Sequence, residues 1–121
     1  MKIHFISKQS EKITMTIQLN AGKDLNIHEL FAEKLKALLT AGLKRFSEHI
    51  TRLEVHLSDE NGTKKGENDK RCVLEARMEG RQPIAVTADA HTHEESVKSA
   101  MHKLKASLDT ITGKMKNYPT K

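Results

Sequence analysis

The stretch from Leu53 to Ala88 constrains the fold most, because apolar and polar residues alternate along it with a period of two. Three runs show this alternation, and Gly80 marks the turn between the second and the third. The apolar positions of the runs are Leu53, Val55 and Leu57, then Cys72, Leu74, Ala76 and Met78, then Ile84, Val86 and Ala88. In the second run, Val73 is an exception, an apolar residue on the polar side. We therefore predict three half-buried strands in an antiparallel meander, with one face that other elements must cover.

An earlier segment shows the same alternation and predicts a first strand, with its apolar positions at Ile13, Met15, Ile17 and Leu19. A turn that contains Gly22 follows, and Asn26 with Glu29 matches a capping box at the start of a helix. We expect this helix to run to about His49 with one apolar stripe. Gly42 interrupts it, and we expect this glycine to mark a close approach to the sheet or a bend.

A second capping box, Thr92 with Glu95, opens the last element. Apolar residues then recur three and four positions apart, at Val97, Ala100, Met101, Leu104, Leu108, Ile111 and Met115, and predict an amphipathic helix. The predicted fold class is α+β, a two-layer β-α-β-β-β-α sandwich with a four-stranded sheet and both helices on one face, as in double-stranded-RNA-binding domains. A right-handed crossover through the first helix makes the first two strands parallel.

The chain of 121 residues has room for one domain. We expect this domain to occupy residues 13–116, preceded by an extension over 1–12 that is either an edge strand or an arm, and followed by a flexible tail over 117–121. No apolar run approaches the roughly 20 residues of a membrane span, and the start lacks the apolar core of a signal peptide. The single cysteine, Cys72, lies on the apolar side of its strand and suits a buried thiol in a reducing compartment. We expect a cytoplasmic protein with no membrane contact.

Basic residues outnumber acidic ones by 21 to 16, and the formal charge of +5 favours a polyanionic partner. The candidate RNA contacts are cations of the polar sheet face, of the long loop between Asp59 and Asp69, and of the last helix. They are Arg52, Lys64, Lys65, Lys70, Arg71, Arg77, Lys98, Lys103, Lys105 and Lys114. The alternative is that these are ordinary solvating charges, since Glu54, Glu75 and Glu79 share the sheet face. The loop is longer than usual for a hairpin, which is typical of a functional or a mobile segment.

Four segments also carry motifs of a known family, in the family's order, within about Ile13 to Met115. The motifs are Leu53-Glu-Val-His-Leu-Ser-Asp-Glu-Asn-Gly, Asp69-Lys-Arg-Cys with Val73-Leu-Glu-Ala-Arg, Gly80 with Pro83-Ile-Ala-Val, and Ala100-Met-His-Lys-Leu. They resemble the ribosome hibernation-promoting factors and ribosome-associated inhibitors, also called sigma-54 modulation or ribosomal subunit interface proteins. The family's fold is β-α-β-β-β-α. Its short members carry a dense basic cluster on the closing helix, of which this chain keeps Lys103 and Lys105 but has Ala106 and Ser107 beside them.

The resemblance implies partners and an activity. The partners are the small ribosomal subunit, its 16S-type rRNA and intact ribosomes, and the binding place is the channel used by messenger and transfer RNA. Binding there blocks translation in stationary phase or stress and favours inactive ribosomes or dimers of them. We expect no cofactor, no small-molecule substrate and a monomeric free protein.

An enzyme is the competing class, and the residues argue against it. His91 and His93 with Glu94 resemble a metal cluster, but zinc sites need three or four positioned ligands, so we interpret this segment as a solvated helix entrance and expect no metal. A buried Cys72 is a poor nucleophile. The glycines of the long loop lack the context of a phosphate-binding motif. We find no catalytic constellation.

Two other modes of RNA binding and one mode of protein binding can be weighed against the residues. Single-strand RNA readers stack bases on aromatic residues of an open sheet, but Phe5, Phe31, Phe46 and Tyr118 lie off the strands of the core sheet. The last helix begins at His93-Glu-Glu-Ser and lacks the lysine-rich entry of double-stranded-RNA-binding domains. A protein-binding module that uses the sheet face or an edge strand, without nucleic-acid contact, is the alternative function, and salt-insensitive binding would favour it.

Overall fold

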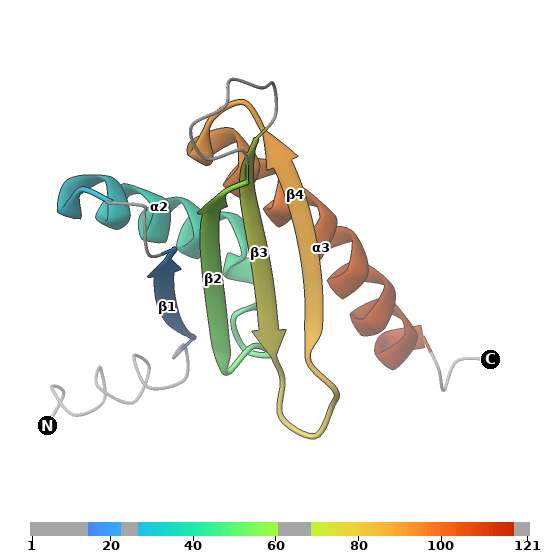
Figure 1. Cartoon of the computed structure of the whole chain (residues 1–121). Coiled ribbons are helices and arrows are strands. Elements are labelled where there is room, and N and C mark those ends of the chain that lie inside the picture. Colours follow the sequence, from blue (N-terminus) through green and yellow to red (C-terminus); the bar gives the residue numbers. More distant parts are fainter. Residues whose placement is uncertain (1–14, 23–26, 61–68, 118–121) are drawn as a thin grey trace, which may run out of the picture.

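The computed structural model describes residues 15–22, 27–60 and 69–117, and it confirms the predicted order of elements. In chain order these are β1 (Thr16–Ala21), α2 (Glu29–Gly42), a 3-10 helix η1 (Lys44–Phe46), β2 (Arg52–Asp59), β3 (Lys70–Arg77), β4 (Ile84–Ala90) and α3 (His93–Asn117). Figure 1 shows both α-helices on the same side of the sheet. The predicted extension over 1–12 lies outside the described residues, and so does the predicted tail over 117–121 except for Asn117, which is the last residue of α3.

The four strands form one sheet in the order β1-β2-β3-β4. β1 is parallel to β2, as the crossover through α2 predicts, and the other two pairings are antiparallel. The register sets Leu53 opposite Ala76 and Leu57 opposite Cys72, so that apolar side chains of neighbouring strands meet on the helix side of the sheet. The exception noted in the sequence, Val73, lies on the other face and is half-buried.

The core lies between this apolar face and the two helices. α2 contributes Leu35 and Leu39, and the turn after it adds further buried side chains, Leu43, Phe46 and Ile50. α3 contributes the fully buried residues Val97, Ala100, Leu104 and Leu108. Because no described element covers the other face of the sheet, the predicted two-layer α+β sandwich is confirmed.

The bounds of α2 differ from the prediction at both ends. The helix begins at Glu29, and its N-cap is His28, whose Nδ1 accepts a hydrogen bond from the Leu30 N–H at 3.1 Å. The predicted cap, Asn26, lies outside the described residues. The α-helix ends at Gly42 instead of about His49, because Leu43 leaves helical geometry and its N–H bonds back to Leu39 and Ala41. The tighter η1 turn then buries Phe46 and returns the chain to the start of β2.

Gly42 marks a close approach, but to α3 and not to the sheet. A Cβ added at this position would clash with Sδ and Cε of the Met101 side chain. The missing side chain therefore lets α2 cross α3 closely at this point. The entrance of α3 follows the prediction, since the Glu95 N–H donates to the Thr92 Oγ1 at 3.1 Å and Glu94 and Glu95 occupy the first turn.

The turn between β3 and β4 depends on Gly80, which has a φ of 75°. A side chain at this position would meet no heavy atom within 4 Å, so backbone strain alone opposes it. We expect Gly80→Ala to lower the free energy of unfolding by about 1–2 kcal/mol in urea denaturation. Gly113→Ala is the matched control, because this glycine lies in α3 with open space around it and alanine favours the helix by about 0.5–1 kcal/mol. Equal effects of the two changes would contradict the role of the turn.

Candidate nucleic-acid interface

The predicted RNA contacts lie on two separate surfaces. Arg52, Arg71 and Arg77 project from β2 and β3 on the open face of the sheet, while Lys98, Lys103 and Lys105 lie on α3 in the helix layer. Lys70 begins β3 at the end of the sheet near the start of α3. Three of the predicted residues cannot be placed in this comparison: Lys64 and Lys65 lie outside the described residues, and for Lys114 the structure describes the backbone in α3 but not the side chain.

On the open face, two arginines lie directly opposite each other in the β2–β3 register, and so do two glutamates one row further along. Glu54 Oε2 lies 3.2 Å from Arg52 Nε and 3.7 Å from Arg77 Nε. Arg77 Nη2 also lies 3.6 Å from Glu75 Oε2. Gln18 of β1 accepts a further hydrogen bond from Arg52. Both arginines are therefore engaged by carboxylates of the same face.

The cations at the other end of the strands are engaged in the same way. Arg71 Nε lies 2.8 Å from Asp89 Oδ1, a second bond joins Arg71 Nη2 to the other oxygen at 3.3 Å, and this arginine holds the pKa of Asp89 below its usual range. Lys70 lies 3.0 Å from an Asp59 oxygen and 3.3 Å from an Asp69 oxygen. An RNA phosphate would have to compete with these carboxylates for each cation.

Lys98, Lys103 and Lys105 of α3 point to two sides of the helix. Lys98 faces α2, because it shares the Glu94 carboxylate with Lys34 of that helix. Lys98 Nζ lies 3.3 Å from Glu94 Oε2, and Lys34 Nζ lies 3.2 Å from Glu94 Oε1. Lys105 lies on the same side seven positions later. Lys103 lies on the β4 side, where its Nζ donates to the backbone carbonyl of Thr87 at 2.7 Å.

The crossing of α2 and α3 carries a local excess of positive charge, and we call its charged residues the helix seam. They are Lys34, Arg45, Glu94, Lys98, Lys105 and Asp109, four cations and two carboxylates. Arg45 makes a paired contact with Asp109, at 2.8 and 3.1 Å, and lowers the pKa of that carboxyl, with a smaller contribution from Lys105. On the strands of the open face, by contrast, three arginines meet the three carboxylates of Glu54, Glu75 and Asp89. The helix seam is therefore the more basic of the two surfaces.

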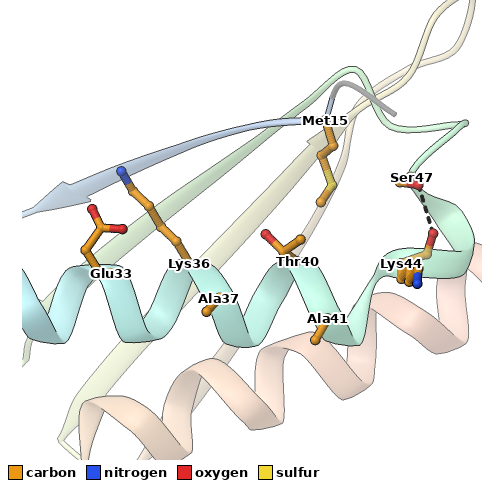
Figure 2. Close-up of a pocket in the computed structure, with 8 residues that line it drawn as sticks. All are labelled: Met15, Glu33, Lys36, Ala37, Thr40, Ala41, Lys44 and Ser47. Atoms are coloured by element: carbon orange, nitrogen blue, oxygen red, sulfur yellow. Dashed lines mark hydrogen bonds between the residues drawn. The ribbon is translucent and has the colours of Figure 1, made fainter. Parts of the chain in front are cut away.

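A groove of about 640 Å³ lies at the other edge of α2, between this helix and the start of β1. Figure 2 shows Glu33, Lys36 and Thr40 directed from α2 toward the strand side, with Met15 opposite them. The Ser47 hydroxyl closes one end by donating to the Lys44 carbonyl at 2.8 Å. The remaining lining is small, with Ala37 and Ala41. The groove brings together no nucleophile, base and orienting group of the kind that catalysis requires.

The structure only partly supports the prediction that His91 and His93 lie in a solvated helix entrance. His91 is exposed, but His93 is half-buried near the ends of β2 and β3, and burial lowers its pKa, with a further lowering from Lys70. Among the described residues, the metal-capable side chains that converge are instead Glu54, His56 and Glu75 on the open sheet face. The sequence analysis missed this group: alternation places Glu54 and His56 on one face of β2, but only the register of the structure sets Glu75 opposite Glu54.

The thiol of Cys72 is fully buried, as predicted, and burial raises its pKa to about 12. Because the thiolate is the reactive form, we expect Cys72 to resist a thiol reagent in the native protein and to react at once in concentrated guanidinium. A disulfide reagent that releases a coloured thiolate measures both rates. Equal labelling rates in the native and the denatured protein would contradict the burial of this thiol.

The chain is similar to known proteins in sequence and in fold. The sequence matches the family model described as sigma 54 modulation protein / S30EA ribosomal protein over residues 21–116. The fold is similar to a ribosomal subunit interface protein from Coxiella burnetii, with a TM-score of 0.63 and 19% identity over 82% of this chain and 99% of that one. It is also similar to the N-terminal domain of Thermus thermophilus Protein Y, with a TM-score of 0.62 and 18% identity over 80% and 99%. No curated protein sequence matches the chain significantly. No helix among the described residues is long and apolar enough to cross a membrane.

Proposed function

The chain belongs to the family of sigma 54 modulation proteins and S30EA ribosomal proteins, and from this membership we propose that it binds the small ribosomal subunit in the channel used by messenger and transfer RNA. The membership confirms the resemblance found in the sequence and makes the protein a ribosome-associated factor. In the proposed state, the bound protein keeps mRNA and tRNA out and holds ribosomes inactive. The partners are 16S-type rRNA, the small subunit and intact ribosomes.

The helix seam is the observation that carries this proposal. Phosphates of folded rRNA are contacted by lysine and arginine, and such contacts are independent of sequence and release counterions. Lys98 and Lys105 lie on the same side of a long helix, beside Lys34 and Arg45 of the neighbouring segment, and only two carboxylates oppose the four cations. We therefore propose the helix seam as the first contact with rRNA.

The open sheet face has a secondary part in the proposal. Arg52, Arg71 and Arg77 stay candidate contacts, but the carboxylates of Glu54, Glu75 and Asp89 match these three cations in number. Lys103 is exposed and adds a cation at the β4 edge. We expect these four residues to adjust the orientation of the protein more than its affinity.

Competition for the channel tests this proposal. The experiment compares binding of the purified protein to empty small subunits with its binding to subunits loaded with mRNA and a P-site tRNA. We expect the loaded subunits to bind the protein much more weakly, and protein synthesis in a purified translation system to fall as the protein is added before mRNA. Equal binding to empty and loaded subunits would contradict binding in the channel.

A further inference from the structure

Two carboxylates and one imidazole converge on the open face of the sheet. Glu54 and His56 are two positions apart on β2, so both side chains project from the same face. The antiparallel register places Glu75 of β3 directly opposite Glu54. One ligand atom from each of these three residues lies within 4.8 Å of the other two.

We propose that Glu54, His56 and Glu75 form a binding site for a divalent transition-metal ion, with Zn²⁺ as the best-fitting probe. Carboxylate oxygen and imidazole nitrogen are both zinc ligands, with bonds of about 2.0–2.2 Å. Two such ligands at a tetrahedral angle are about 3.3–3.4 Å apart. Glu54 Oε1 and His56 Nε2 are 3.4 Å apart, so this pair needs almost no rearrangement to share one ion. Three protein ligands on a solvent-facing surface leave the fourth position to water.

The arginines beside the site engage one oxygen of Glu54 and leave the other directed at His56. Arg52 and Arg77 both approach the Oε2 atom of Glu54, while the Oε1 atom faces His56. They hold the Glu54 side chain, which is only 14% exposed, in a fixed orientation. They also reduce the local negative charge, so we expect a weaker site than the same three ligands would form alone. A metal ion between Glu54 and Glu75 also offsets the repulsion of two like charges that are directly opposite across strands.

Asn20 of β1 completes the arrangement as a positioning residue. Its side-chain amide lies 3.4 Å from His56 Nδ1, the ring nitrogen that points away from the proposed ion. When Nε2 binds a metal, Nδ1 carries the proton, and the Asn20 oxygen accepts it after the amide turns over. Such partners fix the tautomer and the ring orientation of a metal-binding histidine.

Titration calorimetry with zinc chloride, on the full chain without any affinity tag, tests the site. We expect one saturable site in the wild type, at least tenfold weaker binding in His56→Ala and in Glu75→Gln, and a loss of about 10- to 100-fold in Asn20→Ala. We expect much weaker binding of Mg²⁺, because imidazole is a poor ligand for it. Cobalt(II) is a second probe, because its visible absorption depends on the side chains that bind it. Substituting a residue with a purely structural role would leave this absorption unchanged.

Matched controls make the result decisive. His102→Ala removes an exposed histidine of α3 and should leave zinc binding unchanged. Melting without zinc shows whether each variant is folded, and a folded His56→Ala variant that binds zinc as tightly as the wild type would overturn the proposal. So would the absence of saturable zinc binding by the wild type. Because the calorimetry contains no ribosomes, its result does not depend on the proposed function.

Discussion

Replacing Lys98 and Lys105 together by glutamine is expected to weaken ribosome binding roughly a hundredfold at about 0.1 M salt, since each lysine–phosphate contact contributes about tenfold under that condition. Both residues lie on the α2 side of α3, and Lys34 keeps Glu94 paired when Lys98 is removed. The dependence of log K on log salt should also become shallower by about 1.5 to 2 units for the two lost contacts. Sedimentation of the labelled protein with ribosomes at several salt concentrations measures both quantities.

The matched control removes the same charge from the open face of the sheet. Arg52→Gln with Arg77→Gln also removes two cations, but from a face where the carboxylates of Glu54 and Glu75 match them in number. We expect this variant to bind ribosomes within a few-fold of the wild type, with circular dichroism confirming that it is folded. If the two variants lose equal affinity, charge in general and not the helix seam determines binding. If only the arginine variant loses affinity, the sheet face is the interface.

Leu104→Ala is expected to lower the free energy of unfolding by about 2–5 kcal/mol, a large part of the roughly 5–15 kcal/mol that stabilises a domain. Leu104 is fully buried at the centre of α3, in the core that this helix shares with the sheet. Its removal leaves a cavity in the layer that holds the helix seam against the sheet. Urea denaturation followed by circular dichroism measures the change.

The same substitution at Leu30 of α2 is the control, because that side chain is 73% exposed and loses almost no packing. We expect Leu30→Ala to change stability by no more than about 0.5 kcal/mol. Similar values for the two variants would show that α3 does not pack on the sheet as described. A destabilised but folded Leu104→Ala protein should still bind ribosomes in the cold, which separates stability from contact.

Local pattern was enough to predict most of the fold. Alternation identified each strand of the core sheet, and the spacing of Val97, Leu104 and Leu108 identified the buried stripe of α3. The Thr92 cap was also predictable, because a capping box lies within four residues. Chirality of the crossover predicted the parallel pairing of β1 with β2. These features depend on interactions between residues that are close in the sequence or on general rules of handedness.

The rest depends on partners that are distant in the sequence. The reason for Gly42 is Met101, which lies on another helix, and the sequence alone does not show which element approaches a glycine. The end of α2 depends on how Leu43 and Phe46 enter the core. The prediction of the candidate site was limited in the same way. A sequence shows that Arg71 is charged, but it does not show that Asp89 engages this arginine. Which carboxylates engage which cations therefore came only from the structure.

Sedimentation through sucrose gradients, with separated small subunits, separated large subunits and intact ribosomes, tests the central claim most directly. At low salt, we expect the protein to travel with small subunits and with intact ribosomes but not with large subunits, and to be released as salt is raised. Protein that stays at the top of every gradient, or that binds only large subunits, would contradict the account. Binding that salt does not weaken would favour a protein-binding module without RNA contact.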